Sequence, residues 1–284
     1  MTLRRIVAGV FRRLDVPILQ TEDWMTLRAF RKELDSVPRY TPGTIRVKGW
    51  DIEYLDAASF VSAFDNVVVQ RTNDFVHPND HPVILDCGAN IGVSVIHYKR
   101  QFPNAKILAF EPDKRICDVL RRNLKANGIT DVEVIEAAVW TKNGETEFFS
   151  EGADAGRVHD QQDEIADLVE RSASAQMVKV KTIALGDFLH ELIDFIKLDI
   201  EGAESAVLSE CVSGLMNVAS MVVEFHLTTS RPSELGLTMT ALSNAGFKVS
   251  VNSYGQQITL RNKDAVSKNA VEFDQYLLLE AWRN

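Results

Sequence analysis

The sequence predicts an α/β fold built around a parallel sheet. From residue 82 onward, apolar strand patterns alternate with helical patterns. The first of these strands ends in an acid and a glycine loop, where open α/β sheets bind ligands. The chain has 284 residues, of which 45% are hydrophobic and 25% are charged, as expected for an ordinary folded protein. Because strands joined through helices run parallel with right-handed crossovers, we expect an open sheet of mainly parallel strands.

An extension of helices and a hairpin is expected in residues 1–65, ahead of a main domain in residues 66–284. Residues 1–36 carry apolar side chains at helical spacing, with arginines among them. This helix could rest weakly on a membrane surface, but we favour packing on its own domain or on a second copy of the chain. The segments that follow predict a hairpin at 44–55, a short helix at 57–64, and a strand with a loop at 66–75.

The sequence of the main domain predicts a regular order of strands and helices. A helix at 92–102 follows the first strand, and a second at 113–128 can be capped by Asp113. Residues 152–176 are polar and interrupt this order, as an insertion that forms a lid or a substrate wall would. Further helices are expected at 203–214 and 233–246. The expected strands are residues 83–88, 105–113, 131–140, 145–150, 177–183, 194–200, 219–226, 247–251 and 275–282.

The first strand of the main domain points to a cofactor site. It ends on Asp86 and continues into the loop Gly88–Gly92. Glu111 ends the next strand, at the position where an acid commonly accepts hydrogen bonds from ribose hydroxyls. The loop and this acid together predict a cofactor that contains an adenosine group.

The loop residues favour S-adenosylmethionine over NAD. Asn90 occupies the place where a dinucleotide loop has a glycine that gives room to the pyrophosphate. Asp86 would lie beside two phosphate charges, which costs energy. S-adenosylmethionine has no phosphate, and its cationic sulfonium and ammonium favour a nearby carboxylate. Asparagine also tolerates the left-handed backbone that a tight loop needs. An NAD-dependent oxidoreductase stays as the alternative.

Five segments together closely resemble the FkbM-type S-adenosylmethionine-dependent methyltransferases. They are LDCGANIGVSV, AFEPD, VKTIALGDFL, DFIKLDIEGAE and VVEFH, and the resemblance runs from about residue 66 to about residue 226. It implies a class I methyltransferase fold, which is Rossmann-like, with a seven-stranded sheet whose last strand is antiparallel. It also implies S-adenosylmethionine as cofactor and methylation of hydroxyl groups on sugars or polyketide-like natural products.

The resemblance also implies which residues bind the cofactor. The loop residues would hold the methionine part, Glu111 would take the ribose hydroxyls, and two alanines would lie near the adenine. Ser94 would contact the carboxylate end, helped by the backbone N–H groups at its helix start. The implied set comprises Asp86, Gly88, Ala89, Asn90, Gly92, Ser94, Glu111, Pro112, Ala137 and Ala138.

Charged residues on two later strands predict where the chemistry occurs. Lys197 and Asp199 share one side of the strand 194–200, and Glu224 and His226 share one side of the strand 219–226. These four residues form the predicted catalytic set. We expect His226 or Asp199 to take the proton of the acceptor hydroxyl.

Other roles for these charged residues stay open. Asp199, Glu224 and His226 could hold a divalent ion, because mixed oxygen and imidazole ligands suit Mg²⁺ or Mn²⁺. No motif in the sequence proves such a site. The structural alternatives are a buried ion pair between Lys197 and Asp199, and a His226 that lies in a loop.

The sequence as a whole predicts an O-methyltransferase that acts on a sugar hydroxyl, in a polysaccharide or glycolipid precursor, or on a natural product. A non-catalytic cofactor-binding protein of the same fold is a further alternative. The net charge of −9 argues against a nucleic-acid partner, and no apolar run reaches the length of a membrane span. Three widely spaced cysteines and the lack of a signal-peptide pattern predict a cytoplasmic location. The N-terminal helix could also serve a homo-oligomer.

Overall fold

The computed structural model describes residues 22–150, 152–153, 156–158, 176–227, 231, 233–254 and 275–283. The helix predicted in the first part of residues 1–36, with its proposed membrane contact, lies mostly outside these residues. Most of the predicted insertion at 152–176 also lies outside them. Within the described part of the chain, no helix combines the length and the apolar character that a membrane crossing requires.

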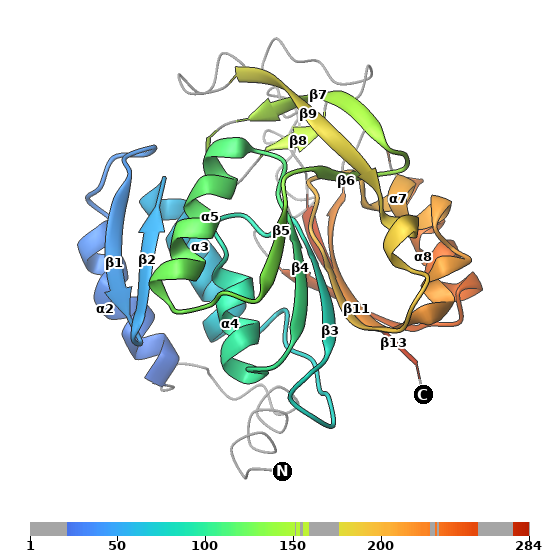
Figure 1. Cartoon of the computed structure of the whole chain (residues 1–284), viewed down its shortest axis with the longest axis horizontal. Helices are drawn as coiled ribbons and strands as arrows, with labels where there is room; N and C mark the ends of the chain where they lie inside the picture. The colour runs from blue at the N-terminus through green and yellow to red at the C-terminus, as the bar shows by residue number, and fades with distance from the viewer. Residues whose placement is uncertain are drawn as a thin grey trace, which may run out of the picture.

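A mixed sheet of seven strands forms the centre of the molecule (Figure 1). Six strands are parallel to one another, and β13 runs antiparallel to both of its neighbours. This arrangement confirms the predicted class I methyltransferase fold with an antiparallel last strand. In order across the sheet the strands are β12 (Lys248–Tyr254), β13 (Gln275–Trp282), β11 (Val218–Leu227), β10 (Ile193–Leu198), β3 (Val83–Cys87), β4 (Lys106–Phe110) and β5 (Val132–Ile135).

Helices cover both faces of this sheet because its central strands are apolar on both sides. In β10, Phe195 packs into one hydrophobic cluster and its neighbour Ile196 packs into another, as the two-residue period of a strand requires. The first cluster includes residues of α4 (Val93–Gln101) and α5 (Lys114–Ala126), and the second includes residues of α7 (Glu204–Glu210) and α8 (Glu234–Asn244).

The amino end of α5 is capped as predicted. The Asp113 side chain accepts hydrogen bonds from the backbone N–H groups of Arg115 and Ile116. Gly128 follows the helix with a φ of 71°, a left-handed conformation that stops it. Two short 3₁₀ helices, η2 (Leu185–Phe188) and η3 (Gly214–Asn217), precede β10 and β11.

The N-terminal extension packs against α4 and α5. It contains α2 (Glu22–Leu34), the antiparallel hairpin of β1 (Gly43–Val47) and β2 (Trp50–Tyr54), and α3 (Ala57–Phe64). The hairpin and α3 confirm the predictions for these segments. Figure 1 shows them gathered on one side of the main sheet. Their apolar residues join Ile84, Ile96 and Phe195 in a single buried cluster, so the extension shares a core with the sheet.

Two asparagines, Asn123 in α5 and Asn127 directly after it, hold the hairpin in place. Asn123 donates to the backbone carbonyl of Glu53 and accepts from its N–H, at 2.9 and 2.7 Å. Asn127 makes the same pair of bonds with Asp51, at 2.9 and 3.1 Å. Residues four apart on a helix lie on one face, so the two amides pair with alternate residues of one strand edge.

The prediction of a strand at 66–75 is wrong. Residues Asp65–Val69 form a π-helical turn, η1, that continues directly from α3. Three consecutive valines suggested a strand, because β-branched residues are enriched there. Val67, Val68 and Val69 are instead buried in the core shared with α2 and α3, and this packing overrides their propensity.

The prediction of one continuous strand at 131–140 is also wrong. Strand β5 ends at Ile135, and β6 (Ala138–Trp140) belongs to a second sheet of four strands. The turn is tight, since the Ala137 N–H donates to the Ile135 carbonyl two residues earlier. The second sheet has the order β6, β9 (Gln176–Ala184), β7 (Gly144–Ser150) and β8 (Arg157–Val158).

The second sheet lies over one end of the main sheet (Figure 1). Its strands β7 and β9 confirm the predictions for residues 145–150 and 177–183. The hydroxyl of Ser150, at the end of β7, donates to the Asp113 carboxylate. Because Asp113 follows β4, this bond ties the second sheet to the edge where the predicted cofactor site lies.

Candidate active site

The glycine loop after β3 has the backbone shape that its sequence requires. Gly88, Asn90 and Gly92 have φ values of 85°, 49° and 91°. The left-handed Asn90 confirms the prediction that this residue makes the bend, and its Oδ1 accepts from the Ile91 N–H at 2.6 Å. A Cβ atom at Gly88 would lie 1.8 Å from the carbonyl oxygen of Asp199, so only glycine allows the loop to pass the end of β10.

Asp86, at the end of β3, lies beneath this loop. Its side chain is fully buried and accepts from the Ser94 hydroxyl at 2.5 Å. The Lys197 ammonium lies 3.5 Å from its other oxygen. Burial raises the pKa of Asp86, although Lys197 and Ser94 oppose this rise. Asp86 and Ser94, both in the implied cofactor set, are thus hydrogen-bonded to each other at the start of α4.

Lys197 connects the loop to the two strands beside it. Its ammonium donates to the Gly88 carbonyl at 2.6 Å and lies 3.1 Å from the Asp199 carboxylate. Burial alone would lower the pKa of Lys197, but the carboxylates of Asp199 and Asp86 outweigh burial and raise it. The predicted ion pair is thus present. Because Lys197 stays charged, it can orient the loop and Asp199 but cannot serve as a base.

Glu111 lies at the end of β4, next to the loop. It accepts hydrogen bonds from the backbone N–H groups of Asn90 and Asp113, at 3.1 and 2.9 Å. Burial raises the pKa of Glu111 to about 8. Its own N–H donates to the Ile135 carbonyl, which also accepts from Ala137. The structure therefore brings the loop, Glu111–Pro112 and the bend at Ala137–Ala138 to the same edge of the sheet.

His226, on β11, is held by two carboxylates that sequence reasoning did not pair with it. Its Nδ1 lies 3.1 Å from Glu204, and its Nε2 lies 3.1 Å from Glu201. Burial would lower the pKa of His226, but the two carboxylates outweigh it and raise this pKa well above its usual value. His226 lies within a strand, so its interpretation as a loop residue is wrong.

Glu204 is the centre of this second cluster. Its side chain is only 1% exposed and accepts from the backbone N–H groups of Ile200 and Gly202 in addition to His226. Glu204 is not among the predicted site residues. This contact with His226 could have been predicted from the adjacency of β10 and β11, because it brings the acids that follow one strand toward the histidine of the next.

Three members of the predicted catalytic set lie close together. Asp199, Glu224 and His226 each offer a ligand atom, and these atoms lie within 4.8 Å of one another. Asp199 and Glu224 are half-buried and His226 is buried. The ends of β10 and β11 therefore converge as predicted, in an arrangement that contains a histidine paired with carboxylates and could also hold a cation.

The sequence of the chain matches a known protein family. Residues 86–249 match the model of the methyltransferase FkbM domain. The chain belongs to the FkbM methyltransferase family. The resemblance inferred from the five sequence segments is thereby confirmed, and with it S-adenosylmethionine as the cofactor of the family.

Individual relatives of this chain are methyltransferases. Methyltransferase sdnD of Sordaria araneosa is 30% identical over 171 residues, which cover 51% of this chain and 66% of sdnD. Methyltransferase 1 of Beauveria bassiana is 25% identical over 231 residues, or 70% of this chain and 91% of the relative. The 2-O-methyltransferase NoeI of Sinorhizobium fredii is 30% identical over 139 residues, or 45% of this chain and 56% of NoeI. The chain thus spans slightly less than two thirds of sdnD and about half of NoeI.

Solved structures resemble this chain at low sequence identity. The TYW2 protein of M. jannaschii in complex with AdoMet is 12% identical, with a TM-score of 0.45, over 87% of this chain and 89% of that chain.

The residues at the sheet edge fit the family cofactor. Glu111 offers a buried carboxylate that can accept from ribose hydroxyls. Asn90 places a side chain where a pyrophosphate would need clearance. The half-buried carboxylates of Asp199 and Glu224 supply the negative charge that a sulfonium favours.

Proposed function

We propose that this chain is an S-adenosylmethionine-dependent O-methyltransferase that acts on a hydroxyl of a sugar or of a natural product. The observation that carries the proposal is His226, a buried imidazole held at both nitrogens by carboxylates at the edge that also bears the cofactor loop. The printed name of NoeI, a 2-O-methyltransferase, supports oxygen as the acceptor atom.

His226 is the proposed base. When bound, the cofactor supplies a methyl group on a cationic sulfonium. In its neutral form, His226 takes the proton of the acceptor hydroxyl at Nε2, while Glu204 holds Nδ1–H and stabilises the imidazolium that forms. For this to occur, Nε2 must exchange its contact with Glu201 for the acceptor hydroxyl. Asp199, the other predicted base, is already engaged by Lys197 and takes a supporting role.

The sharpest test replaces the base. His226→Asn should lower turnover by about 10²- to 10⁴-fold, the usual contribution of a general base. Binding of S-adenosylhomocysteine, measured by calorimetry, should stay within about threefold of the unchanged protein. Methyl transfer is followed by mass spectrometry on a panel of sugar and natural-product acceptors. Full turnover by His226→Asn would remove this assignment.

A metal-assisted mechanism is the second candidate, favoured by the close approach of Asp199, Glu224 and His226. A divalent ion on these ligands could bind the acceptor oxygen and lower the pKa of its hydroxyl. Exhaustive chelation followed by addition of Mg²⁺ or Mn²⁺ separates the two mechanisms. Loss and recovery of activity would support the ion, whereas unchanged activity after chelation supports the His226 base.

A cofactor screen tests the remaining alternatives. A ligand at 100 times its dissociation constant stabilises the folded state by about 2.7 kcal/mol. We expect S-adenosylmethionine and S-adenosylhomocysteine, but not NAD or NADP, to raise the melting temperature. A shift with NAD alone would favour an oxidoreductase. Cofactor binding without transfer to any acceptor would favour a non-catalytic binding protein.

A further inference from the structure

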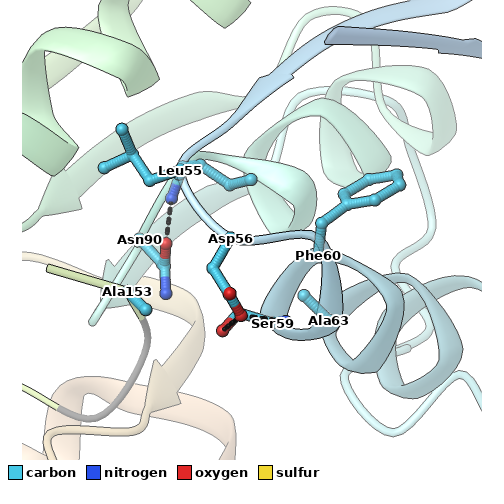
Figure 2. A pocket seen from close by; sticks show the side chains of 8 residues that line it. Leu55, Asp56, Ser59, Phe60, Ala63, Asn90 and Ala153 are labelled. Carbon is cyan, nitrogen blue, oxygen red and sulfur yellow. Dashed lines mark hydrogen bonds between the residues drawn. The ribbon is translucent and has the colours of Figure 1, made fainter. Parts of the chain in front are cut away.

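The acidic residues around the site differ in how firmly they are held. Asp56, which lines the recess beside the glycine loop, accepts from the N–H and the hydroxyl of Ser59 at 2.9 and 2.7 Å (Figure 2). It also pairs with Arg39 and is closed to solvent, so its role is to cap α3. Glu201 also faces a buried partner, His226, but its side chain is 20% exposed. Glu201 therefore contacts both the interior and the solvent.

His226 has a proton to lose before it can act as a base. Two carboxylates raise its pKa well above the usual value, so the ring is an imidazolium at neutral pH in the free protein. Each turnover returns the ring to this form, because the ring then holds the proton of the acceptor hydroxyl. The side chain of His226 is closed to solvent. Its proton therefore reaches water only through a neighbouring group.

Only one of the two carboxylates that contact the ring leads to solvent. Glu204, at Nδ1, is 1% exposed, and the same oxygen accepts from the backbone N–H groups of Ile200 and Gly202. A proton at Nδ1 thus stays between buried groups. Glu201 lies 3.1 Å from Nε2, which is close enough for direct proton transfer. Burial raises the pKa of Glu201, although His226 opposes this rise, so the carboxylate can take up a proton.

The backbone around Glu201 is held while its side chain reaches the surface. Glu201 and Gly202 have φ values of 58° and 100°, in the left-handed region that glutamate rarely adopts. The N–H groups of Ile200 and Gly202, on either side of Glu201, donate to Glu204 at 3.2 and 3.0 Å. These two bonds fix the turn. The Glu201 carboxylate is therefore kept beside Nε2, and only its side chain has to rotate to meet water.

Two other acids lie near the ring. Asp199 and Glu224 each have an atom within 4.8 Å of a ring nitrogen of His226. Both act on the Lys197 ammonium, and Asp199 lies 3.1 Å from it. The charged partner of Glu201 is instead the imidazole itself. Contact and exposure together therefore favour Glu201 as the group that exchanges protons with the ring.

We propose that Glu201 is the proton relay between His226 and solvent. The Nε2–H bond breaks as an O–H bond forms on Glu201, which leaves the ring neutral. Glu201 then gives this proton to water and becomes a carboxylate again. The relay prepares the ring before the acceptor binds and removes the acceptor's proton after each transfer. The inference rests on the proposed function, because a relay serves turnover only if His226 is the base.

Exchange of the ring proton with water tests the relay directly. The full chain is labelled with isotopic nitrogen in histidine, and NMR measures how fast the His226 Nε2–H exchanges with water. The measurement is made below about pH 6, where the ring carries both protons. Glu201→Gln keeps the size of the side chain but cannot take a proton, and Glu201→Asp keeps the acid on a shorter chain. Glu210→Gln, exposed on α7, is the matched control and should exchange at the unmodified rate.

We expect Glu201→Gln to slow this exchange by about 10²-fold, the lower end of what a positioned proton-transfer group contributes, and Glu201→Asp to exchange faster than Glu201→Gln. A purely structural role predicts the opposite order, because glutamine is closer to glutamate in shape, and that order would overturn the proposal. Equal rates in Glu201→Gln and the unmodified chain would overturn it too. Slowing in Glu224→Gln but not in Glu201→Gln would assign the relay to Glu224.

The exchange measurement needs neither cofactor nor acceptor, so it separates the relay from the proposed function. Full turnover by His226→Asn would remove the proposed base. An exchange rate that does not depend on Glu201 would overturn the relay alone.

Discussion

Single carboxylates control the chemistry of the proposed base. Glu204 contacts His226 and two backbone N–H groups of the loop that follows β10. It therefore fixes the ring, sets its charge and shapes the loop at the same time. Glu201 has a φ of 58°, an uncommon left-handed conformation for a residue other than glycine, and such positions cluster at functional sites.

Removing the charge of Glu204 should shift the pH dependence of the reaction. Glu204→Gln keeps an acceptor for the backbone N–H groups but no longer raises the pKa of His226. A base works when neutral, so kcat/KM should rise with pH through the pKa of His226 in the free enzyme. We expect the acidic limb of this profile to move to lower pH by about one unit in the variant. Glu210→Gln, exposed on the same helix, should leave it unchanged.

The same raised pKa affects stability with a definite sign. His226 binds its proton more tightly in the folded state than in the unfolded state, where its pKa is about 6.5. Its contribution to stability is therefore complete below about pH 6.5 and is lost as the pH rises through the folded value. If the acidic limb of the kcat/KM profile does not move in Glu204→Gln, then Glu204 does not raise the pKa of His226.

Glu111 should link cofactor binding to proton release. Burial raises its pKa to about 8, so most of it is protonated at neutral pH in the free protein. Ribose hydroxyls that donate to it favour the ionised form, so binding should release up to about one proton near pH 7. Calorimetry with S-adenosylhomocysteine in buffers of different ionisation enthalpy measures this number. The number of protons released should fall to near zero in Glu111→Gln. A binding heat of the unchanged protein that does not depend on the buffer would contradict the prediction.

At the scale of elements, the hairpin is attached to α5 by amide side chains. Asn123 is fully buried and satisfies both backbone groups of Glu53. Asn123→Ala should lower the free energy of unfolding by about 1–3 kcal/mol, because it leaves these groups without partners. Urea unfolding measures the change, and Lys125→Ala, exposed on the same helix, is the control. Equal stability of the two variants would show that the amide does not hold the hairpin.

At the scale of the whole molecule, the extension and the sheet should unfold together. Their apolar residues form one continuous cluster, in which Phe30, Phe60 and Phe64 of the extension accompany Ile96 and Phe195. We expect a single transition in calorimetry, with equal calorimetric and van't Hoff enthalpies. Two separate transitions would mean that residues 22–65 form an independent unit.

Much of this architecture could be predicted from local patterns. The parallel strands follow from runs such as residues 193–198, and the left-handed Asn90 follows from its place between two loop glycines. These features depend on neighbours in sequence. The spacing of Glu111 from the loop likewise reflects one helix and one strand, so the meeting of Glu111 with the loop could be predicted.

The features that were missed depend on contacts between distant residues. The valines at 67–69 have strand propensity, and only their burial against α2 and α3 makes them helical. The chain leaves the main sheet after Ile135 because a second sheet provides partners for residues 138–140. The partners of His226 come from an adjacent strand end, and the burial of Asp86 depends on Lys197 of β10. None of these pairings has a signature within a single segment.

The position of β13 inside the sheet has a consequence for how the protein is made. Strand β11, which carries His226, pairs along its outer edge with residues 275–282. During synthesis this edge stays open until about 50 further residues have followed, and an open edge can pair with other chains. A chain stopped before residue 275 would therefore lack an interior strand, not a tail, and β12 would lose the neighbour that joins it to the sheet. Strand β11, which carries His226, therefore gains its second neighbour only after residues 275–282 have been synthesised.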